Sequence, residues 1–105
     1  MSTITIKILE TNGHSAPGKL ADAEIHFTGG ELDGLKLVGF AIWQQRNGKG
    51  QNVSFPSRQF TAQGERRSFS MLRWIAKREA QERLENLVIQ AYREHEQRRS
   101  HGESQ

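Results

Sequence analysis

The stretch LKLVGFAIWQ, residues 35–44, decides the fold of this 105-residue chain. Counted at the period of two that a β-strand imposes, apolar side chains fall on both of its sides. One side carries Val38, Phe40 and Ile42, and the other carries Leu35, Leu37, Ala41 and Trp43. A strand that is apolar on both faces lies at the centre of a sheet or is covered on both faces. We therefore expect a helix to cover one face of this strand and a second protomer to cover the other.

Two strands are predicted before this stretch and two after it. Residues 3–10 and 20–28 alternate apolar and polar side chains, which is typical of strands with one buried face. Residues 52–60 and 66–75 alternate in the same way over shorter runs. Because Pro56 has no amide hydrogen, the strand over 52–60 is expected to lie at an edge or to be bulged.

The period changes to 3.6 residues over residues 77–98, which predicts an amphipathic helix. Its apolar stripe consists of Ala80, Leu84, Leu87, Val88, Ala91 and Tyr92. The sequence therefore predicts an α+β fold, in which an antiparallel β-sheet of about five strands is followed by one C-terminal amphipathic helix. We expect a single domain over residues 1–98 and a polar, disordered tail over residues 99–105.

The composition limits the compartment and the chemistry. Cysteine is absent, which excludes disulfides and thiolate chemistry and is typical of a reducing compartment. The N-terminus lacks the basic region and long apolar run of a secretory signal. No apolar stretch approaches the roughly 20 residues that a membrane helix needs. We expect a cytoplasmic protein that does not bind membranes.

Positive charge is concentrated in the middle of the chain. The net charge is only +3, but residues 46–78 carry +7, whereas residues 1–45 and 79–105 carry −2 each. The cations of this middle segment are Arg46, Lys49, Arg58, Arg66, Arg67, Arg73, Lys77 and Arg78. Concentrated cations between acidic ends indicate an anion-binding face, and we predict that these eight residues bind nucleic acid, DNA or RNA.

Aromatic residues are interleaved with these cations. They are Trp43, Phe55, Phe60, Phe69 and Trp74. Cations bind phosphates and release counterions, while aromatic rings offer stacking surfaces to unpaired bases. Two other interpretations stay open. The segment is a solvated charged face over a core that uses the aromatic residues, or it docks an acidic protein partner.

No catalytic or metal-binding pattern accompanies the basic segment. The four histidines have no ligand spacing, and no cysteine is present to complete a zinc site. The glycine-rich residues 47–50 lack the spacing of a phosphate-binding loop and favour a hairpin turn. Nothing resembles a nucleophile with its base. We therefore predict a protein that is not an enzyme, binds no metal or cofactor, and takes no small-molecule substrate.

Several short motifs resemble a known family. Residues 35–43, a turn containing Asn-Gly, and residues 52–58, which end in Phe-Pro-Ser-Arg, follow one another in the order found in the stage V sporulation protein G (septation regulator) family. The sequence Gly-Glu-Arg at residues 64–66 resembles the turn that follows in that family. The Ala-Tyr pair at residues 91–92 resembles the aromatic position of its terminal helix.

The resemblance implies a function that charge and periodicity alone do not give. Members of that family are homodimeric DNA- and RNA-binding regulators of bacteria, linked to septation and cell division, sporulation or gene expression. The resemblance therefore implies a homodimeric, non-catalytic regulatory protein.

Overall fold

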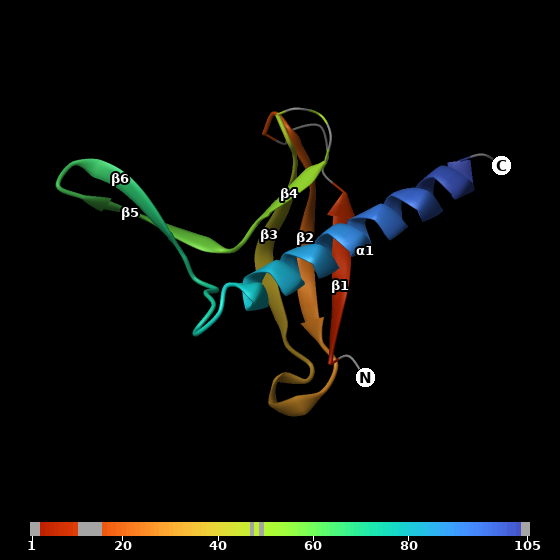
Figure 1. Cartoon of the computed structure of the whole chain (residues 1–105), viewed down its shortest axis with the longest axis horizontal. Coiled ribbons are helices and arrows are strands. Elements are labelled where there is room, and N and C mark those ends of the chain that lie inside the picture. Colours follow the sequence, from red (N-terminus) through yellow and green to blue (C-terminus); the bar gives the residue numbers. More distant parts are fainter. Residues whose placement is uncertain (1–2, 11–15, 47, 49, 104–105) are drawn as a thin grey trace.

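The structure, a computed structural model, describes residues 3–10, 16–46, 48 and 50–103. Four strands form an antiparallel sheet in the order β1-β2-β3-β4, and two more form a separate sheet, β5–β6 (Figure 1). The elements are β1 (Ile4–Glu10), β2 (Lys19–Phe27), the 3-10 turn η1 (Gly30–Leu32), β3 (Lys36–Gln44), β4 (Gln51–Ser54), β5 (Ser57–Ala62), β6 (Glu65–Ser70) and α1 (Glu79–Glu103).

The predicted α+β class, with antiparallel pairing and one C-terminal helix, is confirmed. The strand count differs, because six strands in two sheets replace the expected sheet of about five. The predicted strand over residues 52–60 is interrupted at Pro56, so that its first part pairs with β3 and its second part pairs with β6. Proline lacks the amide hydrogen that a continuous ladder would use there.

A bulge in β3 overturns the predicted distribution of its side chains. Leu37 pairs with Ile25 and Phe40 pairs with Ala23, so Val38 and Gly39 of β3 lie opposite the single residue Glu24 of β2. Gly39, with a φ of +109°, sits inside this irregular stretch. Leu37 therefore joins Phe40 on the helix-facing side, and Val38 is 51% exposed. The prediction that Leu37 and Phe40 lie on opposite faces, which assumed a strict period of two, was therefore wrong.

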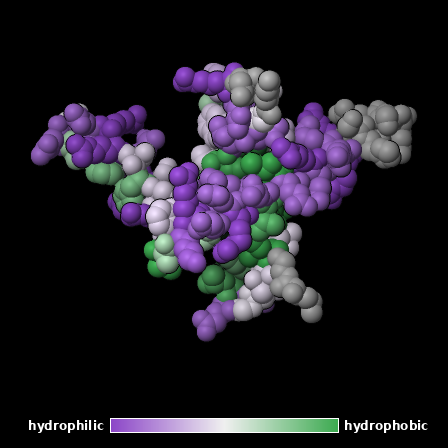
Figure 2. All heavy atoms as spheres, in the orientation of Figure 1, coloured by the Kyte–Doolittle hydropathy of each residue, from purple (hydrophilic) through white to green (hydrophobic). Residues whose placement is uncertain are grey.

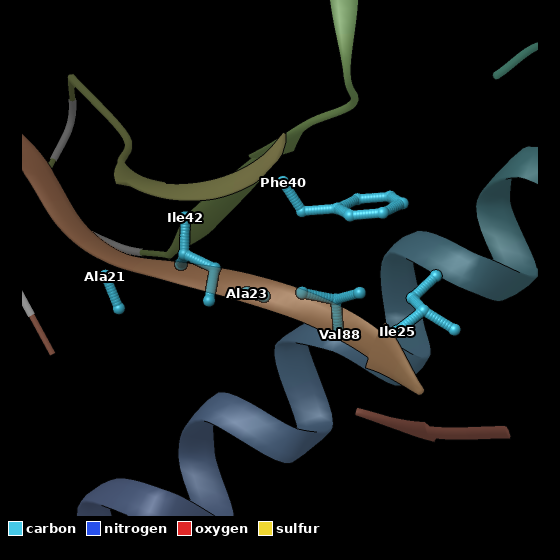
Figure 3. Close-up of a cluster of buried hydrophobic side chains, with 6 residues drawn as sticks. All are labelled: Ala21, Ala23, Ile25, Phe40, Ile42 and Val88. Atoms are coloured by element: carbon cyan, nitrogen blue, oxygen red, sulfur yellow. The ribbon is translucent and has the colours of Figure 1, made fainter. Parts of the chain in front are cut away.

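The core lies between one face of the four-stranded sheet and α1. Figure 3 shows its buried members, which are Ala21, Ala23, Ile25, Phe40, Ile42 and Val88. Val88 is the helix residue of this set and is fully buried against the sheet. The two alanines of β2 are small, which leaves room for the side chains of Phe40, Ile42 and Val88 above them. Burial of each large apolar side chain stabilises the fold by about 1.5–3 kcal/mol.

The helix follows the predicted stripe and continues further than expected. Leu84, Val88 and Tyr92 pack on the core, as the 3.6-residue period predicted. The helix continues through Glu103, past residue 98, from where the sequence predicted a polar tail. Residues 93–99 are Arg, Glu, His and Gln, which include good helix formers, and no proline stops the helix. No helix among the described residues is long and apolar enough to cross a membrane.

The β5–β6 hairpin forms an arm that projects away from the body of sheet and helix (Figure 1). Its loop has two central residues, Gln63 and Gly64, both with positive φ, which is the geometry of a type I′ hairpin turn. At its base the Met71 amide donates a hydrogen bond to the Pro56 carbonyl over 2.8 Å. The described core includes no residue of 57–70, so this arm is an appendage of the folded body.

Gly39 permits the close approach that sends the chain into the arm. A Cβ at this position would lie 3.1 Å from the Pro56 Cβ, and the φ of +109° disfavours any side chain. We expect Gly39→Ala to lower the free energy of unfolding by about 2 kcal/mol in urea denaturation. Gly50→Ala is the control, because its Cβ would make an ordinary 3.5 Å contact with the Gln45 side chain. Equal losses in both variants would contradict the proposed role of Gly39.

Candidate nucleic-acid interface

The arm carries cations and aromatic rings on the same face. Arg58 pairs with Phe69 across the two strands, and Phe60 pairs with Arg67. Directly opposed residues of an antiparallel pair share a face, and so do residues two apart along a strand. These four side chains therefore form one surface, which we call the arm face.

The two rings of the arm face hold each other in place but stay accessible. The Phe60 and Phe69 ring centroids lie 5.7 Å apart, with an interplanar angle of 69° in an edge-to-face contact. Phe60 is 40% exposed and Phe69 is 47% exposed. Exposed rings in neighbouring positions are unusual on a lone hairpin and mark a surface that can receive another molecule.

The opposite face of the arm is polar and has small side chains. It consists of Ser57, Gln59, Thr61, Arg66, Ser68 and Ser70, by the same pairing register. The two faces therefore differ in chemistry, because only the arm face offers rings beside its cations. Figure 2 shows the arm as mainly hydrophilic, with apolar atoms set among the polar ones.

The arm is poor in counter-charges. Glu65 lies 3.5 Å from Arg67, and both side chains are more than half exposed, so water screens this pair strongly. Arg58 and Arg66 form no ion pair with another residue that the structure describes. The arm thus keeps an excess of positive charge along its length.

The segment that leads from the arm to α1 continues the positive charge. Arg73, Lys77 and Arg78 are all exposed there, and only Arg78 has a described carboxylate nearby, Glu82 at 3.9 Å. Trp74 is 47% exposed and Ile75 is almost fully exposed. Six of the eight predicted cations therefore lie on the arm or on the segment that follows it.

The remaining two predicted cations, Arg46 and Lys49, follow β3 in the sequence. Arg46 is exposed, but it follows the end of β3, seven residues beyond Gly39, which contacts Pro56 at the base of the arm. At about 3.3 Å per strand residue, Arg46 lies roughly 20 Å from Gly39 along β3, and so from the base of the arm. Lys49 lies outside the described residues.

The aromatic residues divide between the core and the surface. Phe55 packs edge-to-face on Phe40, with ring centroids 5.2 Å apart, and so belongs to the core edge. Trp43 donates a hydrogen bond from Nε1 to Ser54 Oγ over 2.9 Å on the uncovered side of the sheet. Phe60, Phe69 and Trp74 are the rings that accompany the cations.

The uncovered face of the four-stranded sheet is not the basic face. Lys36 lies 3.4 Å from a Glu24 carboxylate oxygen, and Lys19 lies 2.6 Å from Asp22. A hydrogen bond with His26 holds the pKa of Glu24 below its ordinary value, and Lys36 acts in the same direction. The cations of this sheet are thus balanced by carboxylates, and the excess positive charge resides on the two-stranded sheet.

The described residues contain no group of three or more His, Asp and Glu side chains that could hold a metal ion. Comparison of the chain with protein-family models, with curated proteins and with solved structures found no match.

Sequence reasoning named the arm residues but missed their arrangement. The sequence left open whether Phe60 and Phe69 offer stacking surfaces or lie in the core, since a small core needs aromatic side chains. The signal that could have placed them is the loop of Gln63 and Gly64. A two-residue turn fixes the register of a hairpin, and the register fixes which side chains share a face.

We expect the arm to be dispensable for folding of the body. A variant in which Pro56 and Met71 are joined by two glycines in place of residues 57–70 keeps the whole described core, and the 2.8 Å contact at the base shows that the ends are close. Its free energy of unfolding should fall by less than about 1 kcal/mol in urea denaturation. Phe40→Ala, which empties the core, should lose about 3–5 kcal/mol. A comparable loss on removing the arm would show that the arm stabilises the body.

Proposed function

We propose that this protein is a non-catalytic DNA- or RNA-binding regulatory protein that contacts nucleic acid through the arm face. The observation that carries the proposal is the shared face of Arg58, Phe60, Arg67 and Phe69 on a projecting hairpin. Its cations are accessible, and its rings lie between them. Such a surface offers phosphates and bases their preferred partners side by side.

The two residue types of the arm face would act on different parts of the nucleic acid. The guanidinium groups of Arg58 and Arg67 bind phosphate oxygens, or the acceptor edge of guanine, in a bidentate manner. The exposed rings of Phe60 and Phe69 stack on unpaired bases or contact thymine methyl groups. Arg73, Lys77 and Arg78 extend the phosphate contacts along the segment behind the arm.

The shape of the arm limits the substrate. A two-stranded ribbon fits the major groove of B-form DNA, which is about 12 Å wide. The major groove of duplex RNA is too narrow for it, so RNA would be bound where its strand is unpaired. Duplex DNA and single-stranded RNA are therefore the two substrates to compare.

The motif resemblance supports the same function. The Phe-Pro-Ser-Arg sequence at residues 55–58, which resembles the stage V sporulation protein G (septation regulator) family, spans the step from β4 into the arm. We therefore also propose that this protein is cytoplasmic and bacterial, and that it is linked to septation, cell division, sporulation or gene expression.

We also propose that the protein is a homodimer. The first half of β3 has no β4 partner, because β4 pairs only with Ala41 to Gln44. Beside it lies an apolar cavity of about 520 Å³ that includes Val38, Pro56 and Met71 in its lining. Val38 and Met71 are more than half exposed in the single chain. A second copy at this edge would bury them.

Binding through the arm face predicts a particular salt dependence. We expect Arg58→Glu with Arg67→Glu to weaken binding of random-sequence duplex DNA or single-stranded RNA at least tenfold, because two attractive phosphate contacts become repulsive. Log affinity falls linearly with log salt, and replacing either arginine with alanine should make this slope shallower by about 0.7–0.9 per lost phosphate contact. Fluorescence anisotropy at several salt concentrations measures both quantities.

The control for charge is Arg83→Glu, an exposed helix arginine away from the arm. It should leave the affinity within about twofold of the parent protein. Absence of binding at low salt, or equal losses in the control and the arm variants, would overturn the proposal. Binding of polyglutamate that resists nuclease, without binding of nucleic acid, would assign the arm to an acidic protein partner instead.

The dimer makes a separate prediction. Light scattering after size-exclusion chromatography should give twice the 12.0 kDa chain mass at micromolar concentration. Val38→Glu with Met71→Glu should give the monomer mass, since two buried carboxylates cost far more than they gain. The far-ultraviolet circular dichroism of this variant should match that of the parent protein. A monomeric parent protein would contradict the proposed dimer but would not affect the proposal that the arm face binds nucleic acid.

A further inference from the structure

A small hollow lies where the arm joins the body, between the end of β6 and the first turns of α1 (Figure 1). It consists of two adjoining cavities of about 130 and 390 Å³. Both cavities are lined by Leu72, Arg73, Trp74 and Gln81. We call this hollow the junction pocket. None of its lining residues belongs to the arm face, so it is a separate part of the surface.

The apolar lining of the junction pocket is held in place by the core. Phe55, Leu72 and Leu84 line the smaller cavity, and all three pack against the buried cluster between sheet and helix. The Ser70 hydroxyl donates a hydrogen bond to the Leu72 carbonyl over 2.8 Å, which fixes the turn after β6. A ligand that enters a pocket of fixed shape loses less free energy to ordering the protein.

Trp74 and Arg73 give the junction pocket its chemical character. The Trp74 side chain is 47% exposed, so part of it remains available to a ligand. Arg73 is exposed and pairs with no carboxylate in the part of the chain that the structure describes. A nucleotide has a flat base that stacks on an aromatic ring and a phosphate that a guanidinium binds. The pocket therefore offers a partner to each half of a nucleotide.

The charge around the pocket has two sources of opposite sign. Three carboxylates follow on the first turns of α1, at Glu79, Glu82 and Glu85. Glu82 lies 3.9 Å from Arg78, and Glu85 accepts a hydrogen bond from Gln81 over 3.2 Å. None of the three lines the junction pocket, whose one charged lining residue is Arg73. Residues 57–78, by contrast, carry six cations against one carboxylate, and this stretch attracts a polyanion to the pocket.

We propose that the junction pocket receives one unpaired base of a single-stranded nucleic acid, so that the protein prefers a single strand to a duplex. The inference rests on the proposed function, because the arm face brings the nucleic acid to the pocket. The base stacks on the Trp74 ring above the apolar lining, and the neighbouring phosphate binds Arg73.

A duplex and an aliphatic ligand each satisfy only part of this pocket. Paired bases are stacked inside the duplex, so that only their edges face the grooves. A duplex on the arm would therefore leave the Trp74 ring and the apolar lining in water. An aliphatic side chain of a partner protein would cover the lining but would leave Arg73 without an anion. An unpaired nucleotide supplies a flat face and an anion together.

The fluorescence of Trp74 measures entry of the base directly. The chain has two tryptophans, and Trp43→Phe leaves Trp74 as the single one. Titration of this variant with a 12-residue oligothymidylate should quench its fluorescence, with saturation at the concentration that saturates binding in anisotropy. A 12-base-pair duplex and a 12-residue strand with abasic sites should bind without quenching. Oligouridylate presents nearly the same base on an RNA backbone, and quenching by either strand supports the pocket.

Replacement of the ring should affect the two forms of nucleic acid differently. We expect Trp74→Ala to weaken binding of oligothymidylate about tenfold and binding of the duplex less than twofold, because only the unpaired base loses its stacking partner. Trp74→Phe keeps a ring and should recover most of the lost affinity. Trp43→Phe is the matched control and should bind both like the parent protein. The far-ultraviolet circular dichroism of all three variants should match that of the parent protein.

The arm variants separate failure of the pocket from failure of the proposed function. Arg58→Glu with Arg67→Glu should weaken both the single strand and the duplex. Unchanged Trp74 fluorescence at saturating single strand, equal quenching by the abasic strand, or equal losses for strand and duplex in Trp74→Ala would overturn the junction pocket and leave the arm proposal standing. A parent protein that binds neither form at low salt would overturn the proposed function and the pocket together.

Discussion

The contact between Gly39 and Pro56 is the constraint on which the arrangement of this molecule depends. Pro56 fits against β3 only because Gly39 has no side chain, and the pairing between β3 and β4 ends at Ser54, two residues before Pro56. The chain then leaves the sheet and forms the arm. One close approach thereby produces both the projecting hairpin and the uncovered edge of β3. A continuous strand over residues 52–60 would have hidden both surfaces.

The stability of the molecule is unevenly distributed for the same reason. The buried side chains gather where α1 crosses the four-stranded sheet, whereas the arm is held by its own ladder, by one ring pair and by the hydrogen bond at its base. A lone hairpin is only marginally stable in water. The free energy of opening the arm locally is therefore well below the free energy of unfolding the body. The arm can change its conformation without disturbing the core.

The sequence predicted those features that depend on local periodicity. The α+β class and the helix stripe through Leu84, Val88 and Tyr92 follow from spacing alone. The side chains on each face of β3 could not be predicted in this way, because the alternation with a period of two shifts wherever a bulge inserts a residue. Gly39 and Pro56 each hinted at irregularity, but their contact joins residues of different strands. Predicting the arm face requires the register of the hairpin. Predicting where Arg46 lies requires the distance between it and the base of the arm. Neither quantity can be read from a single segment of the sequence.

The arm and the β1 edge lie at opposite ends of the strand order. The arm leaves the four-stranded sheet beyond β4, whereas β1 is the strand at the other edge (Figure 1). A ligand on one surface alters the other only if the core between them has two packings. Phe40, Ile42 and Val88 are fully buried in one interlocked cluster, and nothing in their arrangement provides a second packing. A ligand on the arm should therefore leave the packing at the β1 edge unchanged.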